Sequence, residues 1–351
     1  MSKILIDDLK MFCQKALETA GMSEDKAEIT AAVLTETDAY GLHSHGTKNL
    51  GPYIGKAEAG GMDLAAEPEI LAEGPAYALV DAHAGIGMVS SVFAMKLACR
   101  KAKECGIALV VVKNSCHFGA AGYYANIAAK ASMIGMAVSN VDPNMTIPGA
   151  RGMVIGNNPF SYAAPSKSLP SVFLDIALSN IASLKVIQAR KDGREVPSTW
   201  IVDKNGLPTT DPSHYPEEGA MQPMAAHKGY GMAVFVELLT GILSGGCTSM
   251  GGDIVSWCFE PEKKNNISHA FLVIDPEKFL GSENIDDRVE EMTEALHRAP
   301  LAKGSEKILV PGELEWNRFR IAEKEGIDLP ADVEASLRAL SEKTGIELKL
   351  F

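Results

Sequence analysis

The sequence lacks the patterns that mark several large classes of protein. Its 351 residues contain no cluster of lysine or arginine, and 45 acidic residues outnumber 33 basic ones, which gives a net charge of −12. Phosphate affinity needs local positive charge, so nucleic acid is not an expected partner. Internal repeats and low-complexity segments are also missing. The remaining composition, 46% apolar and 22% charged, is typical of a soluble globular protein.

Cysteine is scarce and scattered. The six cysteines form no C-x-x-C motif, and no signal peptide is recognisable. Reduced thiols in a cytoplasm are the simplest interpretation, so the expected location is cytoplasmic. Cys116 adjoins His117, which raises the possibility of a nucleophilic Cys–His pair. Neighbouring side chains on a strand point to opposite faces, however, and this counts against such a pair.

Long apolar runs are missing as well. The longest apolar helix candidate, residues 232–243 (MAVFVELLTGIL), is too short to cross a bilayer and contains Glu237. We expect a buried core helix there, and no membrane as a partner.

The stretch 107–124 (IALVVVKNSCHFGAAGYY) carries the most informative pattern. Residues 107–112 form an apolar, mostly β-branched run, typical of a strand buried on both faces. His117 follows a turn, and the small residues 119–122 open a helix. A histidine is therefore expected at a strand-to-helix junction, where α/β proteins bind ligands. The alternative is a core histidine at a strand end, but the small residues beside it leave room for a ligand and favour function.

A second polar group occupies residues 41–50 (GLHSHGTKNL), directly after a predicted helix. The spacing of His43 and His45 suggests a metal site, but no further ligand cluster follows at a suitable distance, so no metal is expected. A solvated loop with incidental histidines remains an alternative. A loop that lines an active site is the favoured interpretation.

Residues 85–90 (GIGMVS) resemble a dinucleotide fingerprint between a predicted strand at 76–80 and a helix that runs to 105. The third glycine is missing, and no acidic residue ends a second strand about twenty residues later. A tight turn beside a packed helix explains this segment at least as well as a phosphate site does.

The rest of the chain alternates strands and helices, which predicts an α/β fold. Polar residues follow two predicted strands, at 140–142 and at Asp175. Lys228 lies near the start of the helix at 227–231 (HKGYG), where it either binds phosphate or is simply solvated. Further strands are expected at 134–139, 160–164, 172–174 and 267–274, and further helices within 1–40 and at 285–298, 315–324 and 331–343.

The chemistry suggested by these residues centres on His117. A histidine gives or takes a proton near neutral pH. The positive end of the helix that follows favours the neutral ring, which can accept a proton from an alcohol as hydride leaves. These residues do not by themselves separate hydride transfer from hydrolysis.

A set of motifs in a fixed order adds a family resemblance. The chain resembles the type-2 malate/L-lactate dehydrogenase family, which includes ureidoglycolate, sulfolactate and diketogulonate oxidoreductases and is unrelated to the Rossmann-type lactate dehydrogenases. The matching motifs are S-H-G at 44–46, G-x-G at 85–87, H-F-G-x-A-G-Y at 117–123, G-x-N-P at 156–159, D-x-A at 175–177, D-x-x-G-x-P-T-T-D-P at 203–212, H-K-G-Y-G at 227–231 and P-G-E at 311–313.

The resemblance implies an architecture in two parts. Residues 1–75 and 311–351 would form a small helical domain, and residues 76–310 a larger, non-Rossmann α/β domain that binds NAD(P). It also implies a homodimer with the active site near the subunit interface. The expected ligands are a small carboxylate substrate and NAD or NADP, with NAD slightly favoured.

The resemblance also assigns roles to individual residues. His117 would be the catalytic proton donor and acceptor, and His45 a second candidate for that role at the substrate. The substrate-binding residues would be Ser44, Lys48, Asn49, Tyr53 and Asp142. The cofactor-binding residues would be Val141, Asp175, Ile176, Ala177, Lys228, Gly312, Glu313 and Leu314.

The sequence departs from the family pattern at Asn49. Many members have an arginine there, which would grip the substrate carboxylate with two hydrogen bonds. Lys48 next to it offers a point charge without that fork. A dicarboxylate such as malate is therefore less secure as the substrate than another 2-hydroxy or 2-oxo acid. Three alternatives remain: reduction of a cyclic imino acid on the same fold, a hydrolase built on Cys116/His117 or His43/His45, and a non-catalytic binding protein.

Overall fold

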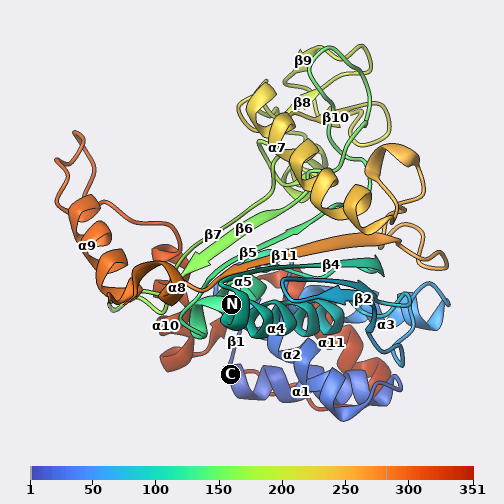
Figure 1. The fold of residues 1–351 in the computed structure, drawn as a ribbon. Helices are drawn as coiled ribbons and strands as arrows, with labels where there is room; N and C mark the ends of the chain where they lie inside the picture. The colour runs from blue at the N-terminus through green and yellow to red at the C-terminus, as the bar shows by residue number, and fades with distance from the viewer. Residues whose placement is uncertain (1, 282) are drawn as a thin grey trace.

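A seven-stranded mixed sheet forms the centre of the molecule (Figure 1). The computed structural model describes residues 2–281 and 283–351. The strand order across the sheet is β2-β3-β4-β11-β5-β6-β7. The strands are β2 (Glu69–Gly74), β3 (Tyr77–Asp81), β4 (Ile107–Ser115), β5 (Ile134–Ser139), β6 (Phe160–Ala164), β7 (Val172–Ile176) and β11 (Ile267–Ile274). The predicted strands are thus confirmed, and β4 extends three residues beyond its apolar run.

The strand directions bring four strand ends to one edge of the sheet. β3 is parallel to β4. β11 is antiparallel to both β4 and β5, and β6 is antiparallel to both β5 and β7. The carboxyl ends of β3, β4, β5 and β7 therefore meet at the same edge. The residues that follow β4, β5 and β7 include His117, Val141 and Ala177, so this topology gathers the predicted site.

Helices cover one face of the sheet in two layers (Figure 1). α4 (Gly87–Cys105) and α5 (Ala121–Lys130) lie against the strands. Both ends of the chain supply the outer layer, and the short strands β1 (Lys3–Ile4) and β12 (Ile327–Asp328) pair with each other. The outer helices are α1 (Ile6–Thr19), α2 (Glu24–Ala39), α3 (Leu50–Glu58), α10 (Glu313–Glu325) and α11 (Ala331–Thr344).

The start of α4 explains the glycines at 85–87. A Cβ on Gly87 would lie 2.3 Å from the carbonyl oxygen of Cys116 and 2.7 Å from that of His117. A glycine is needed because the helix start packs directly against the backbone of the His117 turn. The segment is therefore a tight turn beside a packed helix.

The other face of the sheet carries an upper part, with a three-stranded sheet and two helices (Figure 1). An arm with α8 (Glu277–Leu280) and α9 (Ile285–His297) extends from the opposite end of the sheet. The elements of the upper part are α6 (Ser183–Lys191), β8 (Ile201–Val202), β9 (Pro208–Thr209), β10 (Ala220–Met221) and α7 (His227–Glu237), which continues into a π-helical turn, η2 (Leu238–Ile242).

The prediction of a buried core helix at 232–243 is wrong in part. Glu237, the charged residue, is buried, whereas several apolar residues on the same stretch are 49–56% exposed. Those exposed residues are Phe235, Leu238, Ile242 and Leu243. The apolar run identified the helix, but it could not show which of its faces the sheet would cover. Among the described residues, no helix is long and apolar enough to span a bilayer.

Candidate active site

His117 lies at the carboxyl end of β4, just before α5, as the sequence predicted. Its ring nitrogen Nδ1 is 2.6 Å from the hydroxyl oxygen of Tyr53, which comes from α3. Burial lowers the pKa of His117 well below the ordinary histidine value, and the nearby His45 and His269 lower it further. His117 is therefore neutral at pH 7, and its second ring nitrogen, Nε2, remains for another partner.

Trp257 covers this pair, and no motif in the sequence predicted its place in the site. Its ring lies flat against His117, with centroids 4.9 Å apart and planes 15° apart. It also stacks on Tyr53 at 4.8 Å. His45 stacks on His117 at 5.8 Å. The catalytic candidate is thus held among aromatic rings from three separate segments of the chain.

A second histidine, His269, lies in the sheet below this site. It is fully buried on β11, and burial lowers its pKa to about 3, so it is neutral. Its two ring nitrogens are each 2.9 Å from a serine hydroxyl, Ser139 on β5 and Ser115 on β4. His269 therefore ties together the ends of the two strands that carry the site. The polar pair Ser268-His269 inside the apolar run 267–274 was the signal in the sequence that could have revealed this role.

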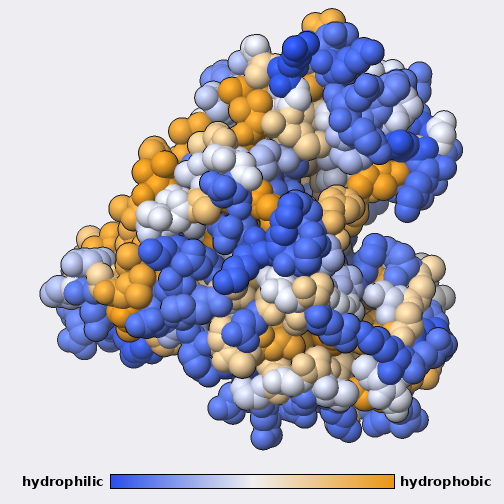
Figure 2. All heavy atoms as spheres, turned by 90° about the vertical axis from the view of Figure 1, so that its right-hand side faces the viewer, coloured by the Kyte–Doolittle hydropathy of each residue, from blue (hydrophilic) through white to orange (hydrophobic). Residues whose placement is uncertain are grey.

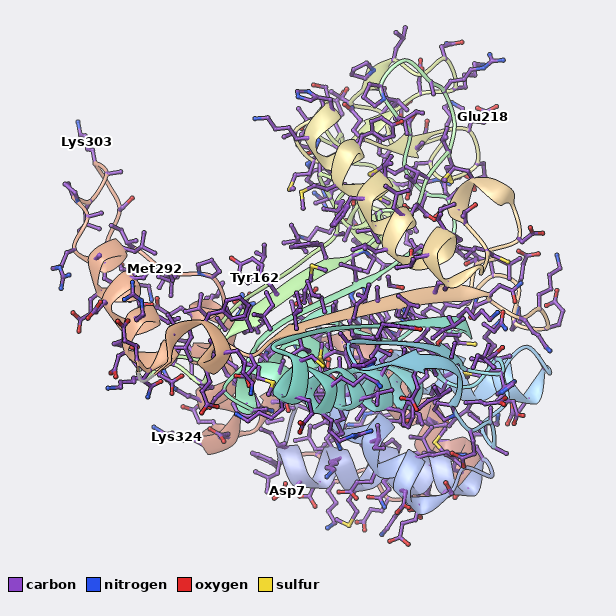
Figure 3. The ribbon with its side chains drawn as sticks, in the orientation of Figure 1. Asp7, Tyr162, Glu218, Met292, Lys303 and Lys324 are labelled. Carbon is purple, nitrogen blue, oxygen red and sulfur yellow. The ribbon has the colours of Figure 1, made fainter. Side chains whose placement is uncertain are left out.

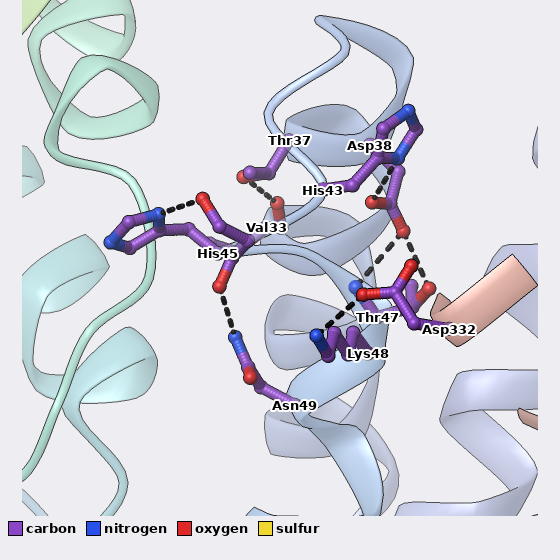
Figure 4. A network of polar contacts seen from close by, with 10 residues as sticks. Val33, Thr37, Asp38, His43, His45, Thr47, Lys48, Asn49 and Asp332 are labelled. Carbon is purple, nitrogen blue, oxygen red and sulfur yellow. Dashed lines mark hydrogen bonds and ion pairs between the residues drawn. The ribbon is translucent and has the colours of Figure 1, made fainter. Parts of the chain in front are cut away.

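The 41–50 segment is organised around the buried carboxylate of Asp38 (Figure 4). It accepts hydrogen bonds from the backbone and hydroxyl of Thr47 and contacts Nδ1 of His43 at 2.9 Å. A Cβ on Gly46 would lie 2.1 Å from Asp38, which explains the glycine of the S-H-G motif. His43 is thus engaged by Asp38, while His45 is left to face His117.

The remaining polar side chains of this segment point in two different directions (Figure 4). The hydroxyl of Ser44 is 2.8 Å from Nδ1 of His45, and the side-chain amide of Asn49 donates to the carbonyl oxygen of Ser44 at 2.9 Å. Lys48 instead forms a 2.6 Å ion pair with Asp332 on α11. The structure therefore brings Ser44, His45 and Asn49 together and directs the charge of Lys48 toward the C-terminal helix.

The end of β5 supplies the opposite side of the site. Asn158 joins two elements here, because its Oδ1 accepts from the backbone N–H of Val141 at 3.2 Å and its Nδ2 donates to Glu237 at 3.1 Å. Burial raises the pKa of the neighbouring Asp142 to about 6. The G-x-N-P motif at 156–159 thus fixes the backbone that carries Val141 and Asp142.

Glu237 is the centre of this side, a role that was not predicted from the sequence. Its carboxylate is 1% exposed and accepts from the side-chain amides of Asn140 at 3.3 Å and Asn158, and from the hydroxyl and backbone of Ser249. A buried carboxylate surrounded by donors is stable as an acceptor. The acidic residue in the apolar stretch 232–243 was the signal that could have revealed it.

The predicted cofactor residues form a strip along β7. Asp175 Oδ2 accepts from the backbone N–H of Gly122, at the start of α5, at 2.7 Å, and burial raises its pKa to about 6. The backbone of Phe173 on β7 bonds to Pro311, which places the 312–314 turn beside the same strand. Just after the carboxyl end of β7, the carbonyl oxygen of Leu178 accepts a hydrogen bond from the backbone N–H of Met224 at 2.8 Å. Met224 lies shortly before α7 and Lys228.

This strip fits a dinucleotide by its chemistry. Gly312 has φ 85°, and a Cβ there would lie 2.4 Å from Phe173, so the turn holds backbone close to the strand. Lys228, on the first turn of α7, is exposed and carries a positive charge suited to a phosphate. Asp175 can accept from ribose hydroxyls. Glu313, by contrast, is engaged with His297 at 2.8 Å, and Leu314 is exposed. Ile176 and Ala177 complete the strip after β7.

The alternative sites examined in the sequence do not assemble. Across residues 2–281 and 283–351, no group of three or more His, Cys, Asp or Glu side chains is placed to hold a metal ion. The thiol of Cys116 points to the carbonyl oxygen of Ala84 at 3.6 Å, and burial raises its pKa to about 11. Cys116 and His117 therefore do not form a nucleophilic pair.

Sequence comparison places the chain among known dehydrogenases. Residues 4–338 match the family model described as malate/L-lactate dehydrogenase. A malate dehydrogenase of Pyrococcus horikoshii is 34% identical over 97% of this chain and 95% of its own length. Ureidoglycolate dehydrogenase (NAD(+)) of Escherichia coli is 31% identical over 94% and 93%. (2R)-3-sulfolactate dehydrogenase (NADP(+)) of Chromohalobacter salexigens is 33% identical over 92% and 93%.

Solved structures agree with the sequence comparison. The malate dehydrogenase of Pyrococcus horikoshii superposes with a TM-score of 0.89 over 99% of this chain and 97% of that chain, at 32% identity. The Δ1-piperideine-2-carboxylate reductase of Pseudomonas syringae gives a TM-score of 0.86 over 97% and 99%, at 28% identity. Sequence, fold and the order of the motifs point the same way, and this chain belongs to the malate/L-lactate dehydrogenase family.

Proposed function

We propose that His117 is the proton donor and acceptor in hydride transfer between NAD(P) and a small 2-hydroxy or 2-oxo carboxylic acid. As a member of this family the chain is an NAD(P)-dependent oxidoreductase that acts on a CH–OH group. The observation that carries the residue assignment is the 2.6 Å contact between Tyr53 and Nδ1 of His117. It fixes the ring and leaves Nε2 for the substrate.

The neutral state of His117 suits the oxidation direction. When Nδ1 carries the ring proton and donates it to the Tyr53 hydroxyl, Nε2 is unprotonated and accepts the proton of the substrate hydroxyl, while the hydride leaves the carbon that bears this hydroxyl. In reduction, the protonated ring returns that proton to the oxygen of the 2-oxo acid. NAD(P)+ supplies the hydride acceptor when bound, and NAD(P)H the donor. Tyr53 and Trp257 hold the ring and keep water away from its faces.

The substrate carboxylate is assigned to the polar corner of Ser44, His45 and Asn49. Ser44 and His45 share a hydrogen bond, so either can turn a donor toward an anion. Asp142 and Tyr53 would line the remaining sides, with Asp142 near the nicotinamide end. Lys48 is left out of this assignment because Asp332 holds its charge.

The cofactor is assigned to the strip along β7. Val141 would lie at its nicotinamide end, and Asp175, Ile176, Ala177, Lys228 and the 312–314 turn along its length. NAD is proposed as slightly preferred over NADP. The reason is electrostatic, because the carboxylate of Asp175 and a chain of net charge −12 disfavour an additional phosphate.

A homodimer is part of the proposal. The exposed apolar residues of α7 and η2 form a patch, and Met292 and Leu296 on α9 are also nearly half exposed. Between them lies the uncovered part of the sheet, where Tyr162 stands in Figure 3. Exposed apolar side chains that gather in one patch are typical of a protein interface. η2 contacts β4 and β11, and α7 contacts β5, so an interface at this patch would lie against the strands whose ends carry His117 and Val141.

Two further assignments belong to the same proposal. Residues 1–75 with 311–351 would form the helical domain, and residues 76–310 the NAD(P)-binding domain; the pairing of β1 with β12 supports joining the two ends. The location proposed is the cytoplasm, because all six cysteines are unpaired.

The test is a substrate panel followed at the absorbance of NAD(P)H, run with both cofactors on the full chain. We expect turnover of at least one 2-oxo acid and an increase in the melting temperature on adding NADH or NADPH. Tyr53→Phe should retain cofactor binding and lower kcat, because the hydrogen bond to Nδ1 is lost. Failure of both nicotinamide cofactors to bind would refute the proposal.

A second candidate is reduction of a cyclic imino acid. It is favoured by the likeness to the Δ1-piperideine-2-carboxylate reductase and by Asn49, which is neutral and so adds no second charge to the polar corner. His117 would then protonate a ring nitrogen instead of an oxygen. Including a cyclic imino acid in the panel separates the two reactions, since the better substrate has the higher kcat/KM.

A further inference from the structure

We propose that Trp257 determines substrate specificity by giving the site a flat apolar wall. The site then selects a 2-oxo or 2-hydroxy acid that has one carboxylate and a flat or apolar remainder, in preference to a dicarboxylate. This inference rests on the proposed function, because it concerns the same site.

The first support is the position of the indole ring. Trp257 lies 4.9 Å from His117 and 4.8 Å from Tyr53, centroid to centroid. A substrate oxygen bound to His117 is about 3 Å from Nε2, so the rest of the molecule comes within contact distance of the indole. An aromatic face attracts flat and apolar groups and leaves a carboxylate without compensation.

The second support is the rigidity of the segment that carries Trp257. Lys56, on α3, is 1% exposed, and its ammonium group donates to the carbonyl oxygens of Glu260 at 3.2 Å, Pro261 at 3.4 Å and Lys263 at 2.5 Å. Asn265 closes the base of the segment with a 2.8 Å bond to Val255. The wall is therefore formed before substrate arrives.

The way Lys56 holds this segment also explains why residue 61 is a glycine. A Cβ on Gly61 would lie 2.1 Å from the carbonyl oxygen of Pro261 and 2.6 Å from that of Lys263. The connector after α3 thus packs against the backbone that Lys56 holds. Lys56 is a positioning residue, because it acts on the substrate through Trp257.

The third support is the placement of charge. A second carboxylate needs a cation to offset its desolvation. The two lysines of the segment 44–56 are committed elsewhere, Lys48 to Asp332 and Lys56 to backbone carbonyls. Asn49 is neutral and donates to Ser44. The polar corner therefore suffices for one carboxylate.

The experiment compares kcat/KM for phenylpyruvate, pyruvate and oxaloacetate in the full-length enzyme, with NADH and with NADPH. We expect phenylpyruvate to exceed oxaloacetate by at least about tenfold. Trp257→Ala should lower the ratio of phenylpyruvate to pyruvate by about tenfold, mainly through KM for phenylpyruvate, and Trp257→Phe should restore most of it. A structural role alone would change both substrates equally.

A second variant covers the case in which Trp257→Ala does not fold. Asn49→Arg adds the missing cation and should raise kcat/KM for oxaloacetate relative to phenylpyruvate by about tenfold. A preference of the wild-type enzyme for oxaloacetate, or unchanged ratios in these variants, would overturn the inference while leaving the proposed function intact. Absence of turnover with all three acids and both cofactors would instead overturn the proposed function, and this inference with it.

Discussion

The two sides of the candidate site are built in different ways. On the side proposed for the substrate (the substrate side, residues 41–53), most polar contacts join residues close in sequence, such as Asp38 with Thr47 and Ser44 with His45. On the side proposed for the cofactor (the cofactor side, around Glu237 and β7), Asn140 and Asn158 reach Glu237 across 97 and 79 residues. The first side is a local loop motif, whereas the second is a buried network that exists only in the folded chain.

The surroundings of the two sides also differ. Ser44 and His45 are exposed, and Figure 2 shows a hollow between the upper part of the molecule and the helical layers. Glu237 and its partners Asn140 and Asn158 are buried. Substitutions should therefore alter selectivity on the substrate side and both stability and cofactor binding on the cofactor side. His117 lies where the two sides meet.

The largest effect should come from replacing the residue at that meeting point. His117→Asn should lower kcat by about 10²–10⁴-fold, because the proton acceptor is lost, while the binding of NADH stays within about threefold. His45→Asn should lower kcat/KM less, and mainly through KM. Steady-state kinetics and NADH titration measure both. Equal losses of kcat in the two variants would show that the substrate side takes part in proton transfer.

The next largest effect should come from the cofactor side. Glu237→Ala should lower the free energy of unfolding by about 2–4 kcal/mol, because several buried donors lose their acceptor. It should also raise KM for NAD(P)H more than KM for the substrate. Chemical denaturation and cofactor titration measure these changes.

Glu237→Gln is the matched control for that variant. It preserves the side-chain shape but places an amide donor against the donors of Asn140 and Asn158. We expect an intermediate loss of stability. If this variant were as stable as the wild type, the charge of Glu237 would contribute nothing to the free energy of unfolding.

A smaller effect should appear in the pH dependence of stability. The pKa of Asp175 is about 6 in the folded state, above the unfolded value of about 3.9, so its contribution to stability is lost as the pH rises through 6. Asp175→Asn keeps an acceptor for Gly122 and removes this loss. The variant should gain roughly 2 kcal/mol over the wild type at pH 8, and little at pH 4. A gain that is independent of pH would contradict a buried, titrating Asp175.

The smallest effect should come from breaking the ion pair between Lys48 and Asp332. Lys48→Met breaks the ion pair with Asp332, which is partly exposed, so the loss of stability should stay below about 1 kcal/mol. KM for the 2-oxo acid should change less than twofold, because the charge of Lys48 faces α11. A large increase in KM would instead show that Lys48 contributes to substrate binding.

The local features of this protein could be predicted from its sequence. The β-branched run before His117 and the small residues after it specified a strand, a turn and a helix, and the structure has all three. The ordered motifs led to the family, which the sequence comparison shows. Each of these depends on neighbouring residues, whose spacing is visible in the sequence.

Tertiary structure alone decided which distant residues meet. The strand order β4-β11-β5 places His269 between Ser115 and Ser139, and the attachment of its segment to Lys56 brings Trp257 onto His117. Lys48 and Asp332 are 284 residues apart, so the sequence could not show that this charge is already paired. Such contacts depend on how the sheet and its layers assemble, because a side chain carries no local record of its distant partner.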